Sequence, residues 1–151
     1  MPDPIFDSRT VRFELPLLFA GQAQKESFVN ETTARIDALL HGAIEAEQAA
    51  PPATPADGQA WLVGAGASGA WLGQVGKIAA RQAGNWLFVT PRDGIKLLNR
   101  SSGQEMRYSG GWKIATRPAL PSGGAVIDAE TRLTITAILA ALTTAGIVPA
   151  T

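Results

Sequence analysis

The spacing of apolar positions changes along the chain, and each change predicts a different element. Between residues 21 and 50 the apolar side chains recur at steps of three and four, which lines one face of a helix. Asn30 can cap that helix with its side-chain oxygen, and the prolines from Pro51 onward end the segment because proline has no N–H to donate. We therefore predict a helix over about Glu31–Glu47, with room for another helical turn or two before it. The apolar residues of the whole segment are Phe28, Ile36, Leu39, Leu40, Ala43 and Ile44.

Residues 55–117 change to short apolar runs separated by glycines, the pattern of strands joined by tight turns. The stretches 78–90 and 105–116 each place a glycine-containing turn before a tryptophan, and each predicts a hairpin. Gly94–Asn99 predicts another strand between them. The expected structure is an antiparallel meander with one buried face.

The remaining segments complete an α+β fold, in which a small antiparallel β-meander domain is flanked by an N-terminal helix and a C-terminal helix. Alternating residues over Val11–Leu15 predict one strand near the N-terminus. Asp128 can cap a helix over about Ala129–Ala145, and Gly146 can end it. The predicted order is an extended arm over 1–20, a helical segment over 21–50, the β domain over 55–117, a linker over 118–127 and the C-terminal helix over 128–146.

Charge and composition limit the possible functions. Lys plus Arg and Asp plus Glu number 13 each, so the net charge is zero, whereas binding along nucleic-acid phosphates needs a surplus of cations. A small net charge provides little repulsion between copies, which suits a protein that works in an assembly. The chain has no cysteine, and its N-terminus has no apolar run long enough for a signal or a membrane span. We expect synthesis in the cytoplasm, no nucleic-acid partner and no membrane insertion.

One motif points toward an enzyme. Residues 64–69, Gly-Ala-Gly-Ala-Ser-Gly, match the G-x-G-x-x-G spacing of a dinucleotide-binding turn, with Asp93 as the acid that would hold a ribose. The following segment carries Gly73, Gly76 and Gly84, and each glycine inside a helix costs roughly 1 kcal/mol relative to alanine. A crossover helix is therefore disfavoured, and a glycine-rich turn is the preferred interpretation.

Other catalytic sets are weaker. His41 lies four residues from Asp37 and from Glu45, so the three could share a helical face as metal ligands, although such a face is more often solvated. Glu105 and Asp93 could hydrolyse a glycoside if they faced each other across a groove. With one histidine, a hydrolase triad would have to recruit His41 from a remote helix. We predict that the chain is not an enzyme and binds no metal or cofactor.

Aromatic residues in a compact β domain can bind carbohydrate, because the apolar face of a sugar stacks on an aromatic ring. Trp61 and Trp86 lie in the most apolar runs and are assigned to the core. Rings that adjoin glycine turns are better placed for exposure. The candidate carbohydrate-binding residues are Trp71, Trp112, Tyr108 and Arg107.

The apolar helical stripes favour self-association. A helix with a wide apolar stripe must pack on its own domain or on another subunit, and copies joined around an axis would bury such stripes. The candidate interface residues are Phe28, Ile36, Leu39, Leu133, Ile138 and Leu142.

Several stretches also carry a family resemblance over roughly residues 15–113. They are LPLLFAGQAQKESFVNE at 15–31, RIDALL at 35–40, PPATPADGQAWLVGAGASGAW at 51–71, NWLFVTPRDG at 85–94 and GGW at 110–112. In these stretches the chain resembles an uncharacterised domain family found in prophages and gene transfer agents of alphaproteobacteria, described as phage tail, fibre or head-spike proteins. That family supplies no catalytic residues to transfer.

The resemblance implies a structural virion protein of a phage-like particle or gene transfer agent. Such a protein would be assembled in the bacterial cytoplasm as a homo-oligomer with other capsid, spike or tail proteins. It would serve as a head-spike or fibre base or a tail-associated adaptor and support host adhesion. The alternative is a carbohydrate-binding module that recognises capsular polysaccharide, a cell-surface polysaccharide, through exposed tryptophans.

Overall fold

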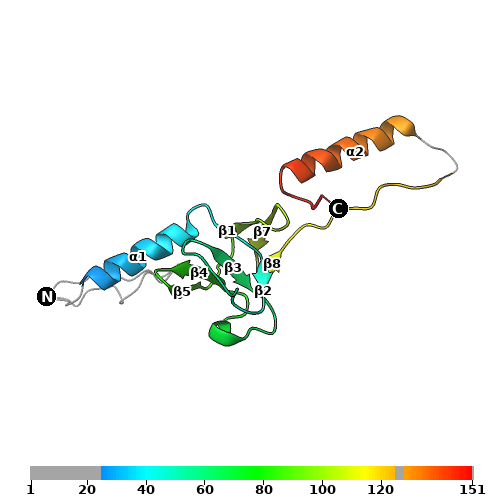
Figure 1. Ribbon diagram of the computed structural model, residues 1–151. Helices are drawn as coiled ribbons and strands as arrows, with labels where there is room; N and C mark the ends of the chain where they lie inside the picture. The colour runs from blue at the N-terminus through cyan, green and yellow to red at the C-terminus, as the bar shows by residue number, and fades with distance from the viewer. Residues whose placement is uncertain (1–24, 125–127, 151) are drawn as a thin grey trace.

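The computed structural model describes residues 25–124 and 128–150 as a compact β module with one helix at each end (Figure 1). The predicted α+β class, with a helix on either side of the strands, is confirmed. The elements in chain order are α1 Lys25–Leu39, β1 Ala43–Ile44, β2 Glu47–Gln48, β3 Ala60–Val63, the 3-10 helix η1 Gly69–Trp71, β4 Ile78–Gln82, β5 Asn85–Val89, β6 Lys96–Asn99, β7 Gln104–Tyr108, β8 Trp112–Lys113 and α2 Ala129–Thr144.

The strands form two sheets, where the sequence predicted one meander. One sheet has the order β1-β6-β7-β8 and the other β2-β3-β4-β5. Neighbouring strands are antiparallel except at two edges, where β1 runs parallel to β6 and β2 parallel to β3. Residues 43–48 therefore supply an edge strand to each sheet. Between these two strands, Glu45 N–H donates to Ala60 O at 2.8 Å, which helps to join the sheets.

Strands β3 and β4 are buried on both faces. Side chains alternate between the two faces of a strand, so β3 directs Ala60 and Leu62 one way and Trp61 and Val63 the other. The first pair joins an aliphatic core with Ile44, Ile78, Ala80, Val89, Leu97 and Met106. The second pair joins a smaller core with Trp71 and Ala79. Two separate clusters thus hold this sheet from opposite sides.

The local signals for turns and caps predicted most strand positions correctly. Both predicted hairpins form, as β4–β5 and β7–β8, and the predicted strand at 94–99 is β6. In the β4–β5 turn, Ala83 and Gly84 have φ of 47° and 74°, the left-handed pair that suits the twist of a two-residue hairpin. The Asp128 carboxylate accepts from Thr131 N–H at 2.9 Å and caps α2 as predicted.

The prediction of a helix over Glu31–Glu47 is wrong. The helix starts earlier, so that Asn30 lies inside α1, and it ends at Leu39. His41 has a left-handed φ of 50°, and a β-carbon on Gly42 would lie 2.6 Å from Leu97 Cδ2. The chain therefore turns at these two residues and brings Ile44 into the core as part of β1. Helical spacing alone could not show this, because the partner of β1 is a distant strand, β6.

The predicted extended arm over 1–20, its strand at Val11–Leu15 and the first part of the resemblance lie outside the described residues, as do residues 125–127 of the predicted linker. Helix α2 lies apart from the β module at the far end of a long connecting segment (Figure 1). The residues after α2 return to the module. Glu105 N–H donates to Gly146 O at 2.7 Å, and the Gln104 amide donates to Ile147 O at 3.3 Å and to Ala115 O at 2.9 Å.

Candidate functional site

The glycine motif does not form a nucleotide site. Residues 64–69 make a loop that is followed by the three-residue helix η1, and the chain then returns in β4, antiparallel to β3. A dinucleotide turn needs a crossover helix that leads to a parallel strand. Ser68 N–H instead donates to Ala49 O at 2.9 Å, which fixes the loop against the chain before β3. Because no crossover helix follows these glycines and the next strand is antiparallel, the interpretation of residues 64–69 as a dinucleotide-binding turn is wrong.

The candidate metal ligands and paired carboxylates are separated. Glu45 lies beyond the end of α1 and forms an ion pair with Arg100 at 3.0 Å, so it does not share a helical face with Asp37 and His41. Within the described ranges, no group of three or more His, Asp or Glu side chains could hold a metal ion. Asp93 caps a turn by accepting from Gly110 N–H at 2.8 Å, and Glu105 pairs with a lysine, so each carboxylate has a structural contact of its own.

The prediction that Trp71 is an exposed stacking ring is wrong. Helix η1 turns this side chain inward, and 0% of it is exposed. It packs edge-on against Trp86, with ring centroids 5.1 Å apart, and lies 6.3 Å from the Trp61 ring. Trp61 and Trp86 are also in edge contact at 5.7 Å, so three tryptophans far apart in sequence make one aromatic cluster. Of these, Trp61 is buried as predicted, whereas Trp86 is partly exposed.

The other three carbohydrate candidates do not share one surface. Tyr108 and Trp112 are paired across β7 and β8 in edge contact at 5.3 Å, and the Trp112 ring N–H donates to Gly76 O at 2.9 Å. Trp112 also packs against the aliphatic core. Arg107 precedes Tyr108 in β7, and adjacent residues of a strand point to opposite faces. Arg107 therefore lies on the outer face of the sheet, away from the two aromatic rings.

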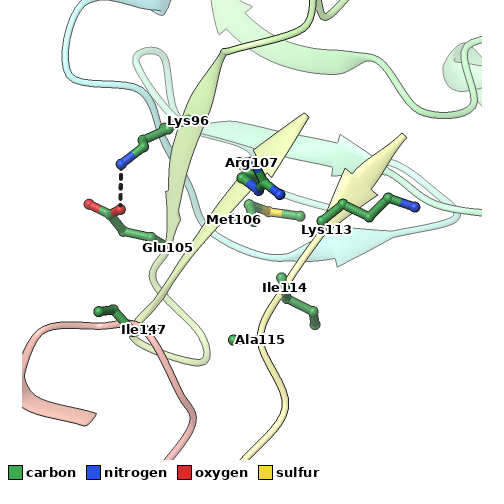
Figure 2. Close-up of a pocket in the computed structure, with 8 residues that line it drawn as sticks. All are labelled: Lys96, Glu105, Met106, Arg107, Lys113, Ile114, Ala115 and Ile147. Atoms are coloured by element: carbon green, nitrogen blue, oxygen red, sulfur yellow. Dashed lines mark hydrogen bonds and ion pairs between the residues drawn. The ribbon is translucent and has the colours of Figure 1, made fainter. Parts of the chain in front are cut away.

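Arg107 lines a cavity on that outer face, with a volume of about 340 Å³ (Figure 2). Lys96 of β6 and Lys113 of β8 line the same cavity, and Figure 2 shows all three side chains with Glu105 and Ile147 around it. The two lysines were not among the residues predicted from the sequence. Their proximity to Arg107 depends on the register of three strands, which the sequence pattern does not supply.

The exposed face of α1 differs from the predicted one. Phe28 and Leu39 are half-buried, and Leu39 packs against the aliphatic core, so it belongs to this chain's own interior. Ile36 remains 42% exposed. Val29 and Leu40 lie seven residues before and four residues after it, which places all three on one side of the helix. This exposed stripe consists of Val29, Ile36 and Leu40.

Helix α2 is apolar on more than one side. At 3.6 residues per turn, Leu133 and Leu142 project about 180° apart, so the predicted single stripe is wrong. Leu139 is buried and Leu142 half-buried, whereas Leu133 is 70% and Ile138 53% exposed. Two exposed alanines, Ala137 and Ala141, lie between these two side chains around the helix, and the exposed Ala140 lies beside Leu133. The exposed face of α2 contains Leu133, Ala137, Ile138, Ala140 and Ala141, with the exposed Thr134 and Thr144 among them.

These features define the class of the molecule as an α+β module of two mixed sheets with apolar helical extensions. Residues 29–113, more than half of the chain, match the family described as protein of unknown function DUF2793, and the chain belongs to this family. No curated protein matches it. Among the described residues, no helix is long and apolar enough to cross a membrane. Helix α2 lies beyond the matched region.

Proposed function

We propose that this protein is a structural component of a phage-like particle or gene transfer agent, a head-spike or fibre base or a tail-associated adaptor. It assembles with copies of itself and with capsid, spike or tail proteins, and it supports adhesion of the particle to the host surface. The resemblance over residues 15–113 provides the particle assignment, and the apolar helix surfaces support the assembly.

The observation that carries the proposal is the exposed face of α2. A helix that is apolar on several sides is normally buried on several sides. In this chain the returning tail covers only part of α2: Val148 N–H donates to Leu142 O, and Val148 is buried. Leu133 and Ile138 remain exposed and can contact a second protein chain. Full burial of a Leu or Ile side chain is worth about 1.5–3 kcal/mol, so contact between helices of several copies would stabilise an assembly.

The anchoring of α2 also suits a connecting element. Its C-terminal end is tied to the segment that follows β8, where Arg117 donates to Thr143 Oγ1 at 2.9 Å and to Pro149 O at 3.1 Å. The other end is held through Arg132, which donates to Pro121 O at 3.3 Å in the connecting segment. The helix therefore lies beyond the β module (Figure 1), where its exposed face is accessible to a second chain.

The oligomeric state tests this proposal. Light scattering of the purified chain should give a mass that is a multiple of one chain. The double variant Leu133→Glu, Ile138→Glu should shift it toward one chain, since a buried unpaired carboxylate would be strongly destabilising in an interface. The control Thr136→Glu adds one negative charge, where the double variant adds two, to an exposed position of α2 without removing an apolar side chain.

Two results would count against the proposal. The first is a wild-type chain that remains monomeric and does not associate with capsid, spike or tail proteins. The second is an unchanged mass for the double variant, which would move the contact away from the exposed face of α2. Electron microscopy of particles with the labelled protein would then test the particle assignment separately.

A further inference from the structure

Three cations form a row across the outer face of the sheet β1-β6-β7-β8. In the strand register, Lys96 of β6 is opposite Arg107 of β7, and Arg107 is opposite Lys113 of β8. Directly opposed side chains on one face of a sheet have Cβ atoms about 4.5–5.5 Å apart. All three residues are exposed. The three cationic side chains therefore leave the sheet side by side in a chain whose net charge is zero, and the Lys96 ammonium is turned toward Glu105 (Figure 2).

Internal contacts neutralise only one end of this row. Lys96 Nζ lies 3.4 Å from Glu105 Oε2, and both side chains are more than half exposed, so the pair is weak. Within residues 25–124 and 128–150, Arg107 and Lys113 have no side-chain hydrogen bond or ion pair. Like charges directly opposite each other destabilise a sheet. An external anion would remove that repulsion, so this arrangement favours anion binding over folding stability.

The cavity beside the row has an apolar wall. Strand β8 ends at Lys113, and Ile114, 58% exposed, follows it along the rim. From the other side the C-terminal tail brings in Ile147, 44% exposed. In Figure 2, Ile114 lies next to β8 and Ile147 lies on the C-terminal tail near the start of β7. The three cations lie farther along the strands. A ligand here can place anionic groups on the row and apolar C–H groups on the two isoleucines.

We propose that this cavity binds an acidic sugar chain, a polysaccharide that carries a carboxylate on successive residues. The inference deepens the adhesion part of the proposed function and rests on it. Sugars that carry carboxylates have both properties that the cavity requires. Their C–H faces are apolar, and their acid groups can form ion pairs with the cations. Repeated acid groups along a chain can contact more than one cation of the row.

A peptide fits this cavity less well. Extended peptides usually add to an open strand edge through backbone hydrogen bonds. At the cavity, Glu105 N–H already donates to Gly146 O, and Arg107 is paired with Lys113 of β8. The edge of β7 is thus occupied. Nucleic acid is disfavoured because three cations on a neutral chain give little counterion release.

The experiment is a calorimetric titration of the full chain with an oligogalacturonate of defined length. The comparison ligands are a neutral glucan oligomer of equal length, the galacturonate monomer and a polyglutamate peptide. The variant is Arg107→Gln with Lys113→Gln, and the control is Lys25→Gln, an exposed cation at the start of α1. We expect the oligogalacturonate to bind, the double variant to bind roughly tenfold more weakly, and the control to match the wild type. Binding should weaken with added salt.

Each alternative outcome would contradict a specific part of the acidic-sugar proposal. Equal binding by wild type and double variant removes the row from the site. Equal binding of the neutral oligomer removes the acid requirement, and equal binding of polyglutamate shows a surface for acidic peptides in place of a sugar site. Saturation by the monomer with the same affinity shows a single-carboxylate site. If the oligogalacturonate fails to bind while the chain still forms oligomers that depend on Leu133 and Ile138, the acidic-sugar inference fails and the assembly proposal stands.

Discussion

The β module buries the apolar side chains of its central strands, whereas helix α2 leaves two large apolar side chains exposed. In the module, β3 and β4 have side chains buried on both faces, and the two clusters they separate are closed within one chain. In α2, Leu139 is buried while Leu133 and Ile138 are largely exposed. The module is held by packing, and α2 is attached by hydrogen bonds from Gln104, Glu105 and Arg117. The module therefore closes its core within one chain, whereas α2 keeps two large apolar side chains exposed among the described residues.

The largest expected effect removes the centre of the aromatic cluster. Trp71→Ala should lower the free energy of unfolding by about 3–5 kcal/mol, because a fully buried aromatic side chain is lost and a cavity remains. Leu72→Ala is the matched control. Leu72 is the next residue and is 74% exposed, so the change should stay within about 0.5 kcal/mol. Chemical denaturation measures both, and similar values would show that the module is not held by this cluster.

An intermediate effect is expected where the tail docks. Gly146 has a φ of 70°, and a β-carbon there would lie 3.1 Å from Gly103 O. Gly146→Ala should cost about 1–2 kcal/mol and weaken docking without unfolding the module. The Glu105 amide, which donates to Gly146 O, should then exchange its hydrogen roughly tenfold faster.

Gly84→Ala is the control for this docking test. Gly84 also has a positive φ, 74°, but a β-carbon there would meet no atom within 4 Å. It shares the backbone strain and lies in the β4–β5 turn, away from the tail. Faster exchange of the Glu105 amide in both variants would mean that the module and tail open together, which would contradict the distinction drawn above.

The smallest effect concerns the start of α2. Hydrogen bonds from the Thr131 backbone N–H, and then from its hydroxyl, hold the pKa of Asp128 below its ordinary value of 3.8. A group with a lowered pKa in the folded chain stabilises it above the ordinary pKa, and that contribution is lost as the pH falls through the lowered value. Helical circular dichroism, followed from neutral pH to below 3.8, should therefore fall more in the wild type than in Asp128→Asn, which can cap without ionising. Identical curves would show that the cap's charge does not stabilise α2.

The sequence predicted those features that depend on neighbouring residues. The Ala83–Gly84 turn and the Asp128 cap are local signals, and both appear at the expected positions. The end of α1 was missed because residues 43–44, which continue the helical pattern in the sequence, pair instead with the distant strand β6. The burial of Trp71 was missed for the same reason, since its partners lie before and after it in other strands.

The candidate cavity was only partly visible in the sequence. Arg107 was predicted as a polar partner for a sugar stacked on the aromatic rings, yet the rings of Tyr108 and Trp112 lie on the opposite face of the sheet. The residues that do lie beside it, Lys96 and Lys113, are brought there by the pairing of β6, β7 and β8. An alternating strand pattern tells which side chains share a face within one strand. It does not tell which residues of different strands become neighbours, because that depends on register.

The short segment 43–48 determines how the protein can be divided for study. It contributes β1 to one sheet and β2 to the other, with only Glu45 and Ala46 between them. A recombinant fragment that begins at Pro51 would leave unpaired backbone donors and acceptors on β6 and β3 at the same time. Such a fragment would tend to aggregate through these two open strands. A synthetic peptide spanning α1 and residues 43–48 should restore its solubility by completing both.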